Sequence, residues 1–456
     1  MTISSRCFYI KAVGISTFRE RRNKMGTDFI LKGNICYSRK SDNIEVAENQ
    51  YVICVEGRSE GVFKEIPDAY ENLPVIDYGD HIIIPGLTDL HIHAPQYSFR
   101  GLGMDLELLD WLETNTFPEE AKFKDLEYAD KAYRIFTDNL KKSATTRACV
   151  FATVHRDATM LLMDRLEESG LVTMVGKVNM DRNAPDYLSE ESYRVSAEET
   201  VKWLMQVENR KYQNTLPILT PRFTPSCTDE LMNELNKIQK LYRLPVQSHL
   251  SENPSEGEWV KELCPWAEVY ADAYARFDLF GGECPTIMAH CVYSNEKEIK
   301  MIKERGVFVA HCPESNANLA SGAAPVRRFL EEGIHVGLGS DVAAGSSENI
   351  FYAMTQAIQV SKLRWRMLDS SLKPLTIDEV FYMATKGGGA FFGRVGSFEP
   401  GYEFDAVVLD DSRLEHPQKL DVGKRLERLI YLADDREIKE KYIRGKSVSC
   451  QKMWRS

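Results

Sequence analysis

The sequence lacks the features that mark membrane, secreted and nucleic-acid-binding proteins. No window holds the roughly 18 consecutive apolar residues of a membrane-spanning helix, so we expect no membrane segment. The first residues contain no apolar core followed by a small-residue cleavage site, so we expect no signal peptide. The formal net charge of −11 argues against nucleic acid and anionic membranes as partners, because these favour basic surfaces.

Cysteine pairs and phosphate-binding glycine patterns are also absent. The ten cysteines form no CxxC pair, so we expect reduced, mostly buried thiols and a cytoplasmic protein. The glycine-rich segment KGGGAFFG, from Lys386, has neither Rossmann nor P-loop spacing and follows a predicted helix. The HxE and PCxxC motifs of one class of zinc-dependent base deaminase are missing as well.

The two ends of the chain share a strand-like texture. Short alternating runs between residues 28 and 84 predict a small antiparallel β unit, and the runs EFDAVVLDD and KYIRGKSV resume this pattern near the C-terminus. We therefore expect one discontinuous β-sandwich domain, formed by residues 28–84 and 396–456. Residues 1–27 show no clear period and are interpreted as an N-terminal extension.

The middle of the chain, residues 85–395, alternates strand-like and helix-like segments. Its strand candidates are LTDLHIH, ATTRACVFATVH, LVTMVGKVN, LPILTPRF, PVQSHLS, TIMAHCV, VFVAHCPES and HVGLGSDVA. Amphipathic stretches such as DELMNELNKIQKLYR lie between them. Successive βα units predict an α/β fold with a TIM-type (β/α)8 catalytic barrel, whose reactive residues lie at the carboxyl ends of its strands.

Metal-binding residue types fall at those strand ends. His91 and His93 are two residues apart in a strand, so both imidazoles can face one ion. His249 and Asp341 end two later strand segments. Three neutral imidazoles and one carboxylate suit zinc, and also iron or manganese.

Two further residues are candidates for proton transfer. Glu252 follows His249 by three residues, where its carboxylate can move the proton of a metal-bound water, the alternative being a helix-capping or surface glutamate. Asp341 can accept a proton from the same water while it holds the metal. His290 is either a fifth ligand or a neighbouring group that orients the water, and the sequence leaves both open.

The remaining histidines carry weaker signals. His155 and His311 end strand segments, so each is either part of the site or a structural hydrogen-bonding group. We expect structural roles for His81, His335 and His416. The fourth strand segment, LPILTPRF, ends without the lysine that often bridges two metals in such barrels, which favours a single ion.

With these residues in view, the chain resembles the amidohydrolase superfamily and, within it, the guanine deaminase family. The HxH, HxxE and SD elements are typical of the superfamily, whereas HAPQ, TFPEE and PRF together select the guanine deaminases. The resemblance extends over about residues 30 to 440. Where that family reads HCPNSN, this sequence reads HCPESN, so Glu314 alters the expected hydrogen bonding of one loop.

The resemblance implies a metal-dependent hydrolase that converts guanine and water to xanthine and ammonia in purine catabolism or salvage. It implies one zinc ion, with iron as the alternative, and a homodimer. The metal-binding positions are matched by His91, His93, His249 and Asp341, with His290 beside them. The proton shuttle is matched by Glu252. The substrate-binding residues are His93, Gln96, Arg222, Phe223, His249, Glu252 and Asp341.

The chemistry of guanine agrees with these positions. An arginine fork and a glutamine amide can pair with the C6 carbonyl and the N7 acceptor, and Phe223 can stack on the ring. The simpler alternatives are a salt bridge for Arg222 and a core role for Phe223. The rival functions are a related deaminase or chlorohydrolase acting on another N-heterocycle, and a non-enzymatic assembly protein on the same scaffold.

Overall fold

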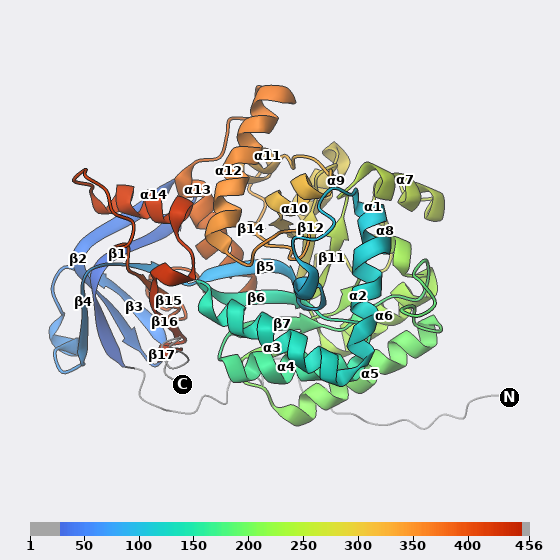
Figure 1. The fold of residues 1–456 in the computed structure, drawn as a ribbon, viewed down its shortest axis with the longest axis horizontal. Coiled ribbons are helices and arrows are strands. Elements are labelled where there is room, and N and C mark those ends of the chain that lie inside the picture. The colour runs from blue at the N-terminus through green and yellow to red at the C-terminus, as the bar shows by residue number, and fades with distance from the viewer. Residues whose placement is uncertain (1–27, 449–456) are drawn as a thin grey trace.

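The computed structural model describes residues 28–448, whose strands form two groups that lie side by side (Figure 1). The strands of the two chain ends form one group, and the strands of the middle form the other, surrounded by helices. The expected N-terminal extension, residues 1–27, lies outside the described residues.

The two chain ends meet in one seven-stranded sheet with the order β17-β16-β15-β4-β1-β2-β3. Its strands are β1 (Phe29–Lys40), β2 (Asn43–Val55), β3 (Arg58–Phe63), β4 (Val75–Pro85), β15 (Ala406–Leu409), β16 (Ile438–Ile443) and β17 (Lys446–Ser447). The prediction of a purely antiparallel unit is wrong at one pair, because β1 and β4 run parallel. Hydrogen bonds join all seven strands into one sheet, so the described residues do not form the two separate sheets expected of a β-sandwich.

Alternation along these strands builds a small core of its own. Phe29, Leu31 and Ile35 are buried on β1, and they belong to one cluster with residues from the C-terminal strands. The rings of Phe29 and Phe404 meet edge to face, with 5.5 Å between their centroids. Side chains of alternate strand residues share a face, which is why residues from both chain ends meet here.

All eight predicted strand segments of the middle contain strands, and every pair among them is parallel. They are β5 (Leu87–His93), β6 (Thr145–Phe151), β7 (Val172–Gly176), β8 (Val178–Asn179), β9 (Thr215–Pro217), β10 (Thr220–Pro221), β11 (Val246–Leu250), β12 (Thr286–His290), β13 (Phe308–His311) and β14 (Val336–Leu338). The third and fourth segments are each divided into two short strands. This arrangement is a TIM-barrel-like α/β fold.

Backbone contacts join the ends of this strand series. The segment after β14 contacts β5, because Asp341 donates its N–H to the carbonyl of His91 at 2.8 Å and His93 donates to Val342 at 3.2 Å. A bridge between Leu219 and Val246 joins the fourth segment to β11. The carboxyl ends of β5, β11, β12 and β14 are thereby brought to one region.

The helices follow the strands along the chain and cover them on the outside (Figure 1). They are α1 (Leu108–Trp111), α2 (Phe117–Ala121), α3 (Leu126–Lys142), α4 (Arg156–Ser169), α5 (Tyr193–Arg210), α6 (Asp229–Tyr242), α7 (Pro254–Leu263), α8 (Asp272–Ala275), α9 (Glu296–Arg305), α10 (Pro313–Asn318), α11 (Val326–Glu331), α12 (Ile350–Met367), α13 (Ile377–Tyr382) and α14 (Val422–Leu432). In α6, the Thr228 side chain caps the first turn, and Leu231 and Leu235 are buried at helical spacing.

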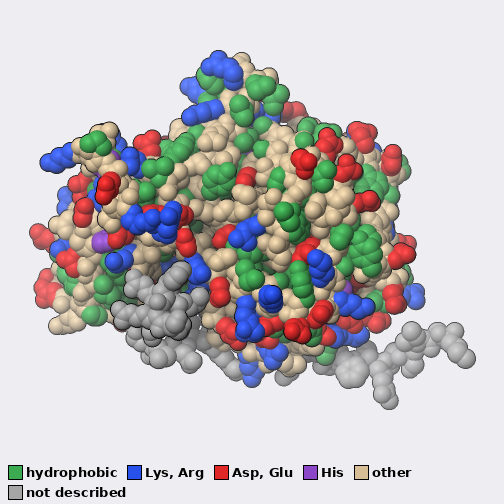
Figure 2. Space-filling view, viewed as in Figure 1, with side chains coloured by type: hydrophobic (Ala, Val, Ile, Leu, Met, Phe, Trp, Pro, Cys, Tyr) green, Lys and Arg blue, Asp and Glu red, His purple; other side chains and the backbone are tan. Residues whose placement is uncertain are grey.

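Among residues 28–448, no helix combines the length and apolar character needed to span a bilayer. The eight cysteines in this part of the chain are free and buried. On the face drawn in Figure 2, acidic and basic side chains intermingle around apolar ones.

A buried ion cluster links the two strand groups. Arg147 on β6 donates from Nε to Asp405 at 2.6 Å and from Nη2 to Glu403 at 2.9 Å, just before β15. Burial opposes ionisation of Glu403, but Arg147 and Arg444 overcome it and lower its pKa to about 2. The cluster therefore holds the Glu403 carboxylate ionised.

We predict that Arg147→Met destabilises the protein, because it leaves the buried carboxylate of Asp405 and the half-buried carboxylate of Glu403 with fewer partners. Breaking a buried pair costs about 3–5 kcal/mol, so the free energy of unfolding from denaturant titration should fall by about that amount. Lys240→Met is the matched control. It removes the cation of an exposed pair with Asp278 and should change stability by no more than about 1 kcal/mol.

The same cluster predicts a pH dependence. Because the pKa of Glu403 is depressed, its contribution to stability is complete above its ordinary pKa of 4.5 and is lost as the pH falls towards about 2. Arg147→Met should lose less stability than the wild type over this window. Equal losses in both proteins, or an unchanged unfolding free energy at neutral pH, would contradict the role of the cluster.

Candidate active site

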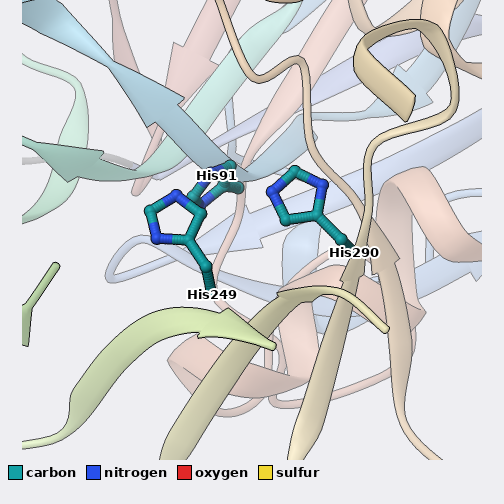
Figure 3. A group of neighbouring side chains, drawn as sticks. All are labelled: His91, His249 and His290. Carbon is teal, nitrogen blue, oxygen red and sulfur yellow. The ribbon is translucent and has the colours of Figure 1, made fainter. Parts of the chain in front are cut away.

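Three histidines from three different strands face one another at the carboxyl ends of those strands (Figure 3). The ring centroids of His91 on β5 and His249 on β11 are 4.9 Å apart. His290, which ends β12, lies 5.4 Å from His91 and 5.5 Å from His249. The positions predicted from three distant motifs are thus neighbours in the fold.

His93 and Asp341 complete a compact set of donor atoms. The Nε2 atom of His93 lies 3.1 Å from that of His91 and 3.4 Å from that of His249. Oδ1 of Asp341 is 3.2 Å from the His91 nitrogen and 3.3 Å from the His93 nitrogen. Ligands bound tetrahedrally to zinc at about 2.0–2.1 Å are separated by about 3.3–3.4 Å, so this spacing fits one ion.

Hydrogen bonds orient two of the imidazoles so that Nε2 faces the centre. Nδ1 of His249 donates to the carbonyl oxygen of Arg222 at 2.6 Å, and Nδ1 of His290 donates to Oδ1 of Asn316 at 2.9 Å. Within the described part of the chain, the buried Nε2 of His290 has no hydrogen-bond partner. It lies 3.4 Å from Oε2 of Glu252 and 3.8 Å from Oδ2 of Asp341. An orphaned nitrogen in this position can bind an ion or a water.

The protonation states suit a metal site. Burial lowers the pKa of His93 to about 4 and that of His249 well below its ordinary value. Burial opposes ionisation of Asp341, but the charges of His91 and His290 and hydrogen bonds from His91 and His93 lower its pKa well below the usual range. The site therefore offers neutral imidazoles at His93 and His249 and an anionic carboxylate at Asp341, the forms in which these groups bind metals.

Asp89 fixes the strand with the two histidines against the loop that carries Asp341. Its carboxylate accepts hydrogen bonds from the N–H groups of His91 and Ser340, both at 3.1 Å, and from the hydroxyl of Ser340 at 2.5 Å. Burial raises its pKa to about 7. The sequence analysis missed this residue, and its only signal is an acidic residue on a buried strand two positions before HxH.

Glu252 lies beside the histidines, with its Oε2 atom 3.4 Å from Nε2 of His290. It is buried just beyond β11, where one carboxylate oxygen accepts from the Ser321 hydroxyl at 3.3 Å. Burial, reinforced by the charge of Asp341, raises its pKa well above the ordinary value. Its backbone N–H donates to Glu256 at 3.0 Å, which fixes the turn. A carboxyl group with a raised pKa beside the donor set is able to carry a proton.

A cavity opens directly onto these groups. Apolar side chains of α1 and of Leu112, the residue after it, form part of its wall. The lining residues are His93, Gln96, Leu108, Trp111, Leu112, Arg222, Phe223, His249, Glu252, His290, Leu319, Asp341 and Ala344. All seven residues that the sequence predicted to contact substrate are among them.

The three residues expected to hold a purine all line the cavity. Arg222 follows β10 and forms an ion pair with Glu120 of α2, with 2.6 Å between Nη1 and Oε2. Gln96 donates from Nε2 to the same carboxylate at 2.9 Å. The ring of Phe223 meets Trp259 edge on, at 6.1 Å. The salt bridge considered for Arg222 therefore exists, while its side chain also lines the cavity.

Glu120 had no assigned role in the sequence analysis, although it belongs to the TFPEE motif. Glu314, which replaces an amide in the resembling family, accepts from the N–H and hydroxyl of Ser346 at 3.0 and 2.6 Å. It thereby ties α10 to the segment that follows Asp341.

The other histidines do not line the cavity. His311 ends β13 beside His290, and burial lowers its pKa to about 3. His155 precedes α4, and burial lowers its pKa to about 4. His335 stacks on Phe308 at 4.5 Å between centroids. His81 lies on β4 of the terminal sheet and donates from Nδ1 to the carbonyl of Tyr78. His416 lies between β15 and α14.

Comparison with known proteins gives one consistent result. The sequence profile of the amidohydrolase family matches residues 82–448. The guanine deaminase of Dictyostelium discoideum is 37% identical over 446 residues, which cover 92% of this chain and 98% of that protein. The guanine deaminase of Mus musculus is 40% identical over 380 residues, covering 80% and 82% respectively.

A solved structure is similar as well. It is the crystal structure of guanine deaminase from C. acetobutylicum with bound guanine in the active site. It superposes with a TM-score of 0.89 at 47% identity, covering 92% of this chain and 100% of that one.

We predict that His93→Asn lowers the metal content of the purified protein, because it removes a nitrogen within 3.5 Å of three other donor atoms. Elemental analysis should find about one equivalent of transition metal in the wild type and well below that in the variant. His335→Asn, a change of the same kind outside the cavity, should keep its metal. A full equivalent in His93→Asn would show that the ion binds elsewhere.

Proposed function

The chain belongs to the amidohydrolase family, and from this premise we propose that it is a guanine deaminase, which hydrolyses guanine to xanthine and ammonia. The observation that carries this proposal is the similarity over 92% of the chain to a structure holding guanine in its active site. The retained donor set and Glu252 argue against a non-enzymatic assembly protein, because such a protein has no need of them.

We assign the middle strands to a closed (β/α)8 barrel, comprising residues 85–395. The hydrogen bonds between β5 and the segment after β14 and the bridge to β11 support closure. Residues 28–84 and 396–456 are proposed as the second domain, supported by their shared sheet. The homodimeric state, the cytoplasmic location and the place in purine catabolism stay predictions from the resemblance.

The donor set is proposed to hold one zinc ion, with iron as the alternative. The ligands are His91, His93, His249 and Asp341, and His290 is either a further ligand or the group that orients the attacking water. When bound, the ion would lower the pKa of a water molecule towards neutrality. Arg222 and Phe223 stand where a bridging lysine would be needed for a second ion, which supports a single one.

The cavity wall supports a defined orientation of guanine. Arg222 and Gln96 donate hydrogen bonds towards the C6 carbonyl and N7, while Phe223 stacks on the ring. This places C2 and N3 towards Glu252 and the histidines. The remaining substrate contacts are His93, His249, Glu252 and Asp341, which line the same cavity.

The side chains then divide the proton transfers between them. Water attacks C2 while Asp341 accepts its proton, and Glu252 delivers a proton to N3. The proton held by Asp341 then passes to the amino group with the help of Glu252, so that the C2–N bond breaks and ammonia leaves. The hydroxyl on C2 gives its proton to Glu252 as the C2 carbonyl of xanthine forms, which returns both carboxyl groups to their starting states. His290 faces the attacking oxygen and stabilises the tetrahedral intermediate. The raised pKa of Glu252 suits a group that receives and returns a proton.

We predict that Glu252→Gln abolishes most turnover while it keeps the metal. The amide preserves shape but carries no proton, and general acid–base catalysis contributes about 10²- to 10⁴-fold, so kcat should fall by at least about 100-fold. Glu258→Gln on the exposed face of α7 is the matched control and should behave as wild type. A Glu252→Gln enzyme within about threefold of wild type would show that another group moves the proton.

Substrate choice provides a second test. Adenine carries an amino donor at C6 where Arg222 donates, and a site built for a polar partner can reject the mismatched analogue by about 10⁴-fold or more. Ammonia release from aminopurines and aminopyrimidines, measured beside chloride release from chlorotriazines, should therefore favour guanine. Arg222→Lys keeps the charge but loses the fork, so kcat/KM for guanine should fall with metal content unchanged. Preference for adenine, cytosine or a chlorotriazine would disprove the guanine assignment.

A further inference from the structure

Glu120 is a buried carboxylate that contacts Arg222 and Gln96, the two polar residues proposed to bind the purine edge. It is 1% exposed, on the short helix α2. Oε2 accepts from Nη1 of Arg222 at 2.6 Å, and Oε1 accepts from Nε2 of Gln96 at 2.9 Å. The guanidinium of Arg222 also lies over the ring of Phe117, 5.4 Å from its centroid. One helix thus supplies two contacts that hold Arg222.

The orientation of the Gln96 amide follows from this contact. Its Nε2 faces the Glu120 carboxylate, which can only accept, and its Oε1 accepts from the N–H of Ala343 at 3.4 Å. Turning the amide over would set two acceptors against each other at one end and two donors at the other. Because Gln96 is buried, a reversed amide would leave these groups without hydrogen-bond partners and is strongly disfavoured.

Both residues consequently have only N–H donors left for a ligand. Arg222 keeps the donors that Glu120 does not occupy, and Gln96 keeps its second amide hydrogen. A purine edge with acceptors at C6 and N7 matches this wall, whereas a 6-amino group meets donors. We propose that Glu120 is a positioning residue that fixes Gln96 and Arg222 as donors and so sets the preference for 6-oxo over 6-amino purines. This inference rests on the proposed function.

The neighbouring glutamate provides a matched control. Glu119 points away from Glu120, because its carboxylate accepts from Lys122 at 2.7 Å and from the hydroxyl of Tyr128. Neither glutamate lines the cavity, but the hydrogen bonds from Arg222 and Gln96 go to Glu120 and not to Glu119. The same Glu→Gln change can therefore be made at Glu120, which has the proposed role, and at Glu119, which does not.

The test compares Glu120→Gln and Glu119→Gln on two substrates that both carry a 2-amino group. Guanine has a 6-oxo group and 2,6-diaminopurine a 6-amino group. Glu120→Gln removes the charge of the carboxylate that holds Arg222 and Gln96, so their hydrogen bonds to a charged group are lost. We therefore expect KM for guanine to rise by about ten- to a hundredfold, with kcat changed by less than about threefold. The ratio of kcat/KM for guanine to that for 2,6-diaminopurine should fall at least about tenfold.

A binding measurement separates recognition from turnover. Hypoxanthine keeps the 6-oxo group and N7 but has no 2-amino group to release, so its dissociation constant should rise in parallel with KM. Glu119→Gln should match wild type in every measurement. Wild-type selectivity and hypoxanthine affinity in a folded, metal-loaded Glu120→Gln would overturn the positioning role and leave the proposed function standing.

A second variant covers the case in which Glu120→Gln does not fold. Gln96→Met leaves the Glu120–Arg222 ion pair intact and removes only the fixed amide, so selectivity for guanine should again fall. Unchanged selectivity in Gln96→Met would also overturn the proposal. A metal-loaded wild type that does not deaminate guanine would instead refute the proposed function itself.

Discussion

The contact between β5 and the segment after β14 is the constraint on which the site depends. Asp341 donates its N–H to the His91 carbonyl, and Asp89 accepts from Ser340 across the same seam. These bonds place a carboxylate from the end of the strand series beside two histidines from its beginning. Without that seam, the donor atoms of His91, His93 and Asp341 would not lie within 3.5 Å of one another.

Desolvation explains why the site needs so many supporting groups. Three carboxylates near the cavity are almost fully buried, and an ionised carboxylate is costly in such surroundings unless it is paired. Glu120 is paired with Arg222, and Asp341 is paired with the histidines. Glu252 instead retains a proton, because its pKa is raised. The roles proposed for these three similar side chains, an anchor, a ligand and a proton carrier, follow from their differing environments.

The sequence revealed those parts of the site that local periodicity encodes. The two-residue period of a strand predicted that His91 and His93 share a face, and strand ends predicted the positions of His249 and Asp341. Asp89 and Glu120 escaped prediction because their partners are distant in the chain, 251 and 102 residues away for Ser340 and Arg222. The parallel pairing of β1 with β4 escaped for a similar reason, since alternation predicts a strand but not its neighbour.

The proposed metal site and the proposed purine contacts meet at one residue, Arg222. The side chain of Arg222 faces Glu120 and the cavity, while its carbonyl oxygen accepts the Nδ1 proton of His249 at 2.6 Å. The backbone of Arg222 thereby orients the imidazole of His249, a proposed metal ligand, and its side chain is proposed to orient the purine. A substitution that alters only the guanidinium leaves the carbonyl in place, so recognition can change while the donor set persists. A shift of the backbone at this position would disturb both at once.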